Sequence, residues 1–204
     1  MEGGDLNQEG SMGDTPLAWV ARDGHEEVVE MLLGRSDIDP NKPGLCALTP
    51  LCYAALNGHK GMVKILLSRS DVDPNKPAHD DQTPLRCAAR NGHQGVMKIL
   101  LSRDDVDPNE RDNDHRTHLF NAAWNGREEV VEILLRRDNV DPNKVHDRYT
   151  PLLSAVQNGQ EGVVKMPLGR GDVNLHTRLV RRNTTPLCYP EWGRENCGNA
   201  VRTG

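Results

Sequence analysis

The sequence repeats with a period of about 34 residues, and this constrains its fold more than any other feature. A Thr-Pro-Leu motif opens most units, changed to Thr-His-Leu in the fourth, with its threonine at Thr15, Thr49, Thr83, Thr117, Thr150 and Thr185. The steps between them are 34, 34, 34, 33 and 35 residues. Nine residues after each of the first five threonines stands a glycine: Gly24, Gly58, Gly92, Gly126 and Gly159. Such a period is typical of a solenoid, in which each unit packs only on its neighbours.

Each unit is predicted to form two short helices. Thr followed by Pro favours a helix start, because the hydroxyl can accept a hydrogen bond from a first-turn amide and Pro has no amide to leave unpaired. The glycine then favours a left-handed cap. Apolar residues at i, i+3 and i+4 follow, as around Val130 and Leu134, and predict an amphipathic second helix that Asp-Val-Asp-Pro-Asn ends. Helices this short are marginal alone, so the units must stack.

These motifs, T-P-L, A-A, N-G-H, V-V-x-x-L-L and D-V-D-P-N, resemble the ankyrin repeat. Asn57-Gly58-His59 and Asn91-Gly92-His93 are similar in particular to long ankyrin arrays of fungal proteins. The resemblance implies an all-α solenoid of about five helix-turn-helix units with connecting loops or β-turns, plus a degenerate sixth. It also implies recognition of protein partners through a concave face formed by the loop tips and the first helices.

Three regions are expected: a flexible polar N-terminus over residues 1–13, the array over 14–182, and a degenerate sixth repeat or disordered tail over 183–204. Pro167 falls inside the second helix of the fifth unit and should fray it, since proline removes a helical hydrogen bond and clashes with the preceding turn. In the sixth unit the small pair is replaced by Pro190 and Glu191, and Arg194 stands where the glycine is expected.

Composition limits the partners and the compartment. A formal charge of −5 and a pI near 5.9 do not favour nucleic acid or an anionic membrane, both of which call for a basic surface. The first 13 residues lack the apolar core of a signal peptide, and no stretch reaches the roughly 18 apolar residues of a membrane span. We therefore expect a monomeric cytoplasmic protein. A short basic stretch with Arg178, Arg181 and Arg182 leaves the nucleus open.

The five cysteines are odd in number and contain no C-x-x-C pair, so plain thiols are expected rather than a disulfide or zinc framework. Asp105, Asp107 and Asn109 have the spacing that opens a calcium loop, but Glu110 and Arg116 stand where Gly and a closing Glu are needed. The in-register histidines, His25, His59 and His93, are interpreted as one structural role repeated at each helix junction, because one layer of about 10 Å separates them. No metal or cofactor is predicted.

No phosphate-binding loop, G-x-S-x-G elbow or H-E-x-x-H helix occurs in the sequence, so no catalytic site is predicted. The favoured function is a non-enzymatic scaffold that binds another protein. Two alternatives stay open: the array is the sensing arm of a larger receptor or enzyme, or it is a decayed array without a partner.

By the resemblance, the partner would meet two columns of variable residues. The first column, just before each threonine, holds Asp14, Leu48, Gln82, Arg116 and Tyr149. The second, seven residues after it, holds Arg22, Leu56, Arg90, Trp124 and Gln157. Aromatic and Arg side chains dominate binding hot spots, so we expect Arg90, Arg116, Trp124 and Tyr149 to contribute most, with Leu48, Leu56 and Gln82 beside them. For Trp124, packing on the next helix is the structural alternative.

Overall fold

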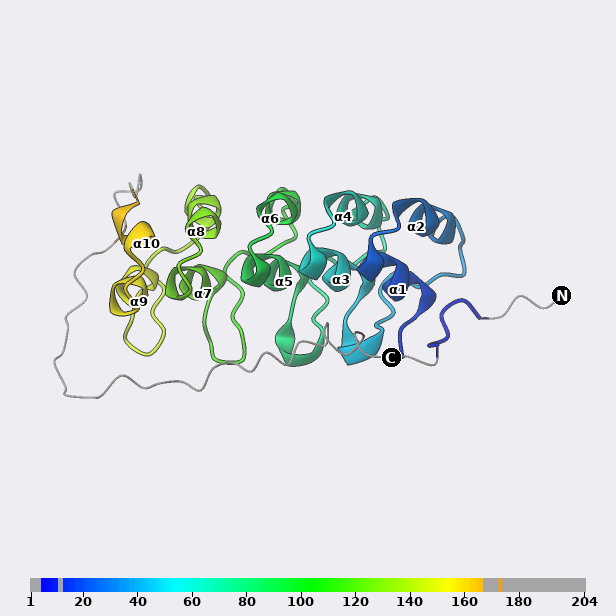
Figure 1. The fold of residues 1–204 in the computed structure, drawn as a ribbon, viewed down its shortest axis with the longest axis horizontal. Helices are drawn as coiled ribbons and strands as arrows, with labels where there is room; N and C mark the ends of the chain where they lie inside the picture. Colours follow the sequence, from blue (N-terminus) through cyan, green and yellow to red (C-terminus); the bar gives the residue numbers. More distant parts are fainter. Residues whose placement is uncertain (1–4, 11–12, 167–172, 174–204) are drawn as a thin grey trace.

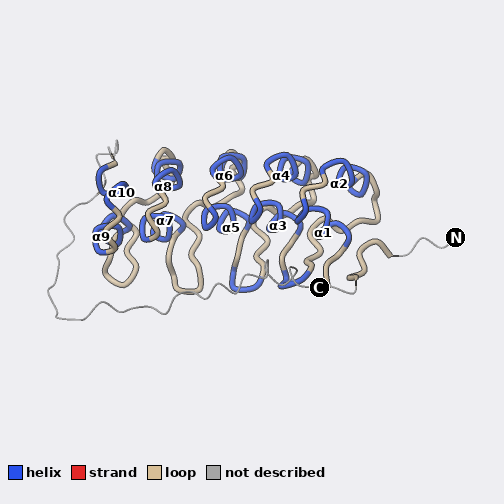
Figure 2. Tube along the Cα trace, in the orientation of Figure 1, coloured by secondary structure: helices blue, strands red, loops and turns tan. Residues whose placement is uncertain are grey.

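The computed structural model describes residues 5–10, 13–166 and 173, and in them the chain forms an elongated stack of helix pairs (Figure 1). One row holds the first helix of each unit, α1 Pro16–Asp23, α3 Pro50–Asn57, α5 Pro84–Asn91, α7 His118–Trp124 and α9 Pro151–Gln157. The other holds α2 Glu26–Leu33, α4 Lys60–Leu67, α6 Gln94–Leu101, α8 Glu128–Leu135 and α10 Glu161–Lys165. Loops joining the units extend to one side of the first row (Figure 2), with short 3-10 turns at Leu45–Ala47 and His79–Asp81.

The predicted helix starts and ends are confirmed. In each unit the threonine hydroxyl accepts a hydrogen bond from the amide three residues on, as from Ala18 to Thr15 at 3.2 Å and from Cys52 to Thr49 at 3.1 Å. The five glycines have φ values from 66° to 80°, the left-handed region that a residue with a Cβ enters only at a cost.

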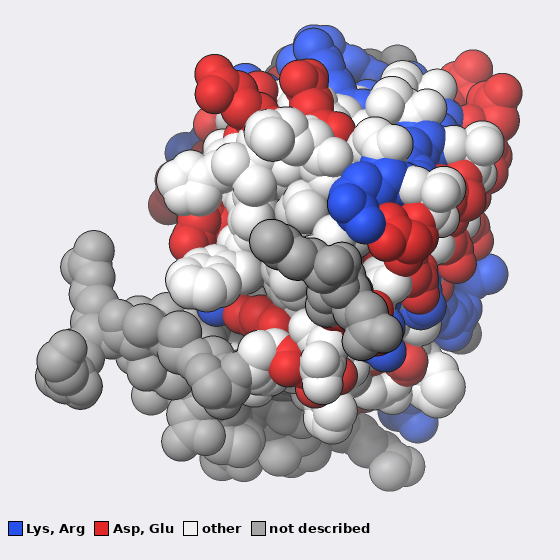
Figure 3. All heavy atoms as spheres, turned by 90° about the vertical axis from the view of Figure 1, so that its right-hand side faces the viewer, with Lys and Arg blue, Asp and Glu red and all other residues white. Residues whose placement is uncertain are grey.

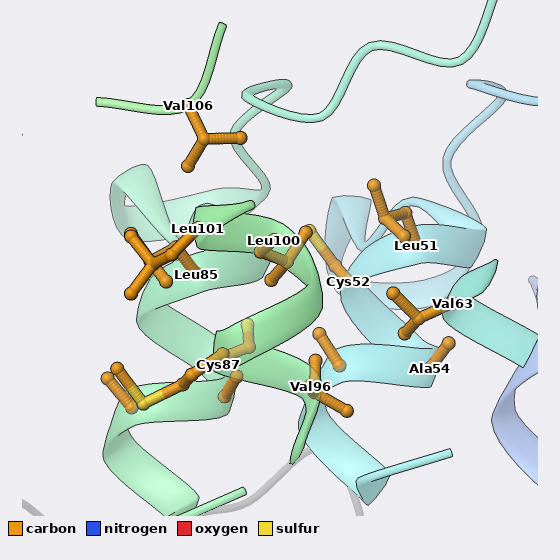
Figure 4. Packing of buried hydrophobic residues seen from close by; sticks show 14 of the residues in the cluster. Leu51, Cys52, Ala54, Val63, Leu85, Cys87, Val96, Leu100, Leu101 and Val106 are labelled. Carbon is orange, nitrogen blue, oxygen red and sulfur yellow. The ribbon is translucent and has the colours of Figure 1, made fainter. Parts of the chain in front are cut away.

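The core is a series of thin apolar layers (Figure 4). Small residues such as Ala54 and Ala88 are fully buried and let adjacent first helices approach closely, while Leu66, Leu100 and Leu134 fill the space under the second helices. The aliphatic residue of each connecting loop is also buried: Ile38, Val72, Val106 and Val140. Every layer is therefore shared between two units, as stacking of marginal helices requires.

The Asp-Pro-Asn loops tie each unit to the next. The Asn41 side chain donates to the Asp71 carbonyl at 2.6 Å and accepts from the Asp73 amide at 2.8 Å. Asn75 and Asn109 make the same donation to the following loop, at 2.6 Å in both cases. These asparagine side chains thus form a ladder of hydrogen bonds between loops. Of the residues that resembled calcium ligands, Asn109 binds the next loop, whereas the Asp105 carboxylate accepts from Arg103 and the Asp107 carboxylate accepts from the Asn109 amide.

We expect Asn41→Ala to lower the free energy of unfolding by about 2 kcal/mol, since two hydrogen bonds are lost at about 1 kcal/mol each. Urea denaturation followed by circular dichroism measures this. Asn113→Ala, at an exposed loop position outside the ladder, is the control and should change stability by less than about 0.5 kcal/mol. Equal effects of the two substitutions would contradict a stabilising ladder.

The first link of this ladder lies upstream of the first unit. Asn7 donates to the Asp37 carbonyl at 2.6 Å and accepts from the Asp39 amide at 2.7 Å, and its own amide donates to Asp5 at 2.9 Å. These are the contacts of the later Asp-Pro-Asn loops, one period upstream. Residues 5–10, which fall within the segment predicted as a flexible N-terminus, occupy the place of a loop preceding the first unit.

The fifth unit departs from the others where the sequence suggested. Helix α10 has five residues, whereas each other second helix has eight. Its C-cap, Met166, has an extended ψ of 135°, the conformation favoured before a proline. Pro167 itself, the sixth unit and the basic stretch lie outside the described residues.

Two cysteines are buried free thiols, Cys52 on α3 and Cys87 on α5. Cys46 lies in the 3-10 turn Leu45–Ala47 and has a left-handed φ of 59°.

Candidate protein-binding surface

The two predicted columns of variable residues lie next to each other. In the first unit, Arg22 of the second column forms an ion pair with Asp14 of the first at 2.6 Å. In the fifth unit, the Gln157 side chain donates to the Tyr149 hydroxyl at 3.4 Å. In these two units, therefore, the residue before the threonine lies beside the residue near the end of the first helix.

In the first two units, residues of these columns are buried or bound to other parts of the protein. Asp14 is buried and accepts hydrogen bonds from the Tyr53 hydroxyl and the Leu45 amide, both at 2.8 Å. Burial raises the pKa of Tyr53, and the Asp14 carboxylate adds to the shift. Leu48, predicted as a contact residue, is only 6% exposed and belongs to the core, so it is not available to a partner.

Two further predicted contact residues, Leu56 and Gln82, are half-buried and contact interior groups. Leu56 is half-buried and packs against the core, and its carbonyl lies 2.8 Å from His93 Nε2. Gln82 is half-buried, and its carbonyl accepts from the Cys52 thiol at 3.4 Å. Arg90, by contrast, is exposed at the end of α5.

The fourth and fifth units bring several predicted residues together. Trp124 stacks on Phe120 with ring centroids 6.1 Å apart, and Phe120 meets the edge of His146 at 5.1 Å. Arg116 Nε lies 3.5 Å from His146 Nε2. Trp124 and Arg116 thereby belong to one cluster, and both keep part of their surface exposed.

Sequence reasoning missed the two residues that link this cluster. Phe120 is buried, and its position four residues before Trp124 on a helix was the signal that could have found it. His146 comes from the loop of the next unit, 30 residues after Arg116, and no local sequence pattern indicates a contact between side chains of two units. The ring that Trp124 stacks on belongs to its own helix, α7, whereas the structural alternative placed this packing on the next helix.

A shallow hollow of about 380 Å³ adjoins the cluster, between the loop tips of the fourth and fifth units. Charged and imidazole groups dominate its lining, which consists of Arg111, Asp114, His115, Arg116, Val145, His146 and Asp147. Arg116 and Asp114 lie 3.5 Å apart across it. Such a mixed lining can hydrogen-bond both acidic and basic side chains of a protein.

The loop tips hold a strained backbone. His115 has φ of 61°, and Asp147 and Arg148 have φ of 46° and 75°, in the left-handed region that residues with a Cβ rarely adopt. Asp112 holds one of these tips in place by accepting from the Arg116 amide at 2.8 Å and from the Asn121 side chain at 2.9 Å. Ala47 and Asp81 have a left-handed φ at the same position of the earlier loops, so this strain belongs to the turn of each connecting loop.

His118 replaces the proline that begins the first helix in the other units. Its side chain is buried, and neither ring nitrogen has a hydrogen-bond partner among the described residues. Burial lowers the pKa of His118 to about 4, and the Arg86 guanidinium contributes to the shift. The imidazole is therefore neutral near pH 7.

Two further findings concern the described residues only. No group of three or more His, Cys, Asp or Glu side chains there is placed to hold a metal ion. None of the helices in that part of the chain is long and apolar enough to cross a membrane.

The stacked helix pairs and interlocked loops define a repeat protein of the solenoid class. A family model described as ankyrin repeats (3 copies) matches residues 1–78, 36–112, 53–146 and 105–177. The chain belongs to the ankyrin repeat family. A search of curated proteins finds no significant match to the chain. Ankyrin repeats are in general modules of protein–protein interaction and are typically non-enzymatic.

Proposed function

We propose that this chain is a non-enzymatic scaffold that binds another protein through the concave face of its ankyrin array. The observation that carries the proposal is the cluster of Trp124, Phe120, His146 and Arg116 beside the hollow between the last two loop tips. Arg90 extends this surface onto α5, and Tyr149 extends it into the fifth unit.

Physical reasons favour this part of the face. Trp and Arg give large contact area and directed hydrogen bonds, and partial burial limits the entropy lost on binding. Trp124 stacks on Phe120, which in turn contacts the edge of His146, so the Trp124 ring is held in place before a partner arrives. In the first two units the same columns are occupied by internal bonds, which leaves the fourth and fifth units as the centre of the surface.

We expect the double substitution of Trp124→Ala and Arg90→Ala to abolish capture of the main partner from the source cell. Two hot-spot residues contribute about 4 kcal/mol together, which is about a thousandfold in affinity. The captured protein should then be purified and titrated calorimetrically against both forms. The thermal midpoint of the variant should shift by only a few degrees, about 1 kcal/mol.

Arg136→Ala on α8 is the matched control, since Arg136 is exposed on the other row of helices and pairs with Glu132 at 2.5 Å. It should bind as the wild type does. Retained binding by the double variant, or unfolding caused by Trp124→Ala alone, would show that Trp124 is a packing residue and not a contact.

A further inference from the structure

The α1–α2 end of the array exposes apolar side chains at positions that most later units bury in whole or in part. Val28 is 43% exposed, whereas residues at the same position of the other units are at most 2% exposed: Met62, Val96, Val130 and Val163. Trp19 is 50% exposed, and its counterpart Tyr53 is 4% exposed. Met31 is 75% exposed. Figure 3 looks onto this end, where atoms of uncharged residues occupy the centre, with charged side chains around them.

The same end carries polar groups that in later units reach back to the preceding unit. His59 Nε2 lies 3.0 Å from the Arg22 carbonyl, and Gln160 Nε2 donates to the Trp124 carbonyl at 3.1 Å. His25 occupies this position in the first unit and is exposed. Arg69 likewise donates to the Leu33 carbonyl at 2.9 Å.

The opposite end shows the complementary half of the same interface. Val156 on α9 is 53% exposed, whereas Ala123 at its position in the fourth unit is 1% exposed. Val164 on α10 is 40% exposed, and its counterpart Val131 is 2% exposed. The carbonyl of Gln157 stands where those of Arg22 and Trp124 accept hydrogen bonds from the next unit.

We propose that a second copy of this chain docks its α9–α10 end onto the α1–α2 end. The chain itself supplies both halves of a unit–unit contact: Trp19, Val28 and Met31 on one side, and Val156 and Val164 on the other. His25 would meet the Gln157 carbonyl of the second copy. This departs from the monomer expected from the sequence.

Residues 5–10 fill the loop position before the first unit through Asn7, so the second copy would contact this end through helices and not through a loop. The contact is head-to-tail and does not close on itself, so association continues beyond a dimer as concentration rises. In this register Glu161 comes beside Glu27, so screening of the two charges by salt strengthens association.

Sedimentation velocity of the wild-type chain from micromolar to millimolar concentration tests the proposal. The expected result is a mass that rises past the dimer, and more steeply at higher salt. Met31→Glu and Val164→Glu each disable one end and are each expected to be monomeric, whereas their equimolar mixture forms dimers and nothing larger. Lys98→Glu, at an exposed position on α6 in the middle of the array, should associate as the wild type does.

A wild-type chain that stays monomeric throughout would overturn the proposal and leave the α1–α2 end to a different partner. Dimers of Val164→Glu alone would also overturn it, because they would show two α1–α2 ends pairing with each other. Circular dichroism confirms that each variant is folded, and Val28→Ser is a milder substitution for the α1–α2 end. Concave-face binding, measured with Trp124→Ala and Arg90→Ala, is independent of either result.

Discussion

His118→Pro is expected to raise the stability of the array and to remove much of its sensitivity to mild acid. At pH 7 we expect a gain of about 2 kcal/mol, because two buried ring nitrogens without partners are removed and proline restricts the unfolded chain. Pro is the residue at this position in the other four described units, and Thr117 before it has the extended ψ of 164° that proline favours.

The acid sensitivity follows from the buried imidazole. The pKa of His118 is about 4 in the folded chain, below its ordinary value of 6.5, so between these pH values the unfolded state binds a proton that the folded state does not. Stability due to the neutral imidazole is complete above pH 6.5 and is lost as pH falls to 4. The difference in pKa corresponds to about 3 kcal/mol.

Urea denaturation at several pH values gives the free energy of unfolding of the wild type and of His118→Pro. Titration of the carboxylates affects both proteins alike, so the difference between the two curves reports His118 alone. His115→Asn is the control, since His115 is exposed and asparagine tolerates its left-handed φ of 61°. Parallel curves for the wild type and His118→Pro would mean that the imidazole is hydrated or paired in the folded protein.

Gly58→Ala is expected to cost about 3 kcal/mol, and Gly92→Ala only about 1 kcal/mol. The two glycines have φ of 75° and 74°, so a Cβ imposes the same backbone strain at both. At Gly58, however, the new Cβ would lie 2.6 Å from His93 Nδ1, and nothing lies within 4 Å of a Cβ at Gly92. The ring of His93 would have to move away from the Leu56 carbonyl, which lies 2.8 Å from its Nε2.

The backbone strain is the same in both variants. The difference between their losses in the free energy of unfolding therefore measures the contribution of His93 between two units. Chemical denaturation of both variants gives the two values. Combining Gly58→Ala with His93→Ala should remove the clash, and the cost of the glycine change in that background should fall to that of Gly92→Ala. Equal losses for the two single variants would show that His93 rearranges freely.

Most of the fold was predictable because its determinants are local. A threonine cap, a proline after it and a left-handed glycine act within one helix, and their repetition places every unit. A structural role could be predicted for the in-register histidines, but their hydrogen-bond partners could not. The carbonyl that His59 contacts belongs to a residue 37 positions away.

The candidate surface was less predictable, and Leu48 shows why. It occupies the same column as Arg116, and the residues before the two, Ala47 and His115, have similar left-handed φ values of 56° and 61°. Leu48 is nonetheless buried in the core, whereas Arg116 lines the hollow, because an apolar side chain is stabilised by burial and a guanidinium group by contact with water and polar groups.

The asparagine ladder has a consequence for how such a protein can change over generations. Its side chains meet backbone groups 30 and 32 residues further along, and the arginines and histidines reach back 36 and 37 residues, so each link connects only adjacent units. Excision of one complete period would bring Asn41 to the Asp105 carbonyl, where it would find the same acceptor that Asp71 offers. Whole units can therefore be duplicated or deleted by recombination without any compensating substitution, whereas an insertion of a few residues would break every link across it.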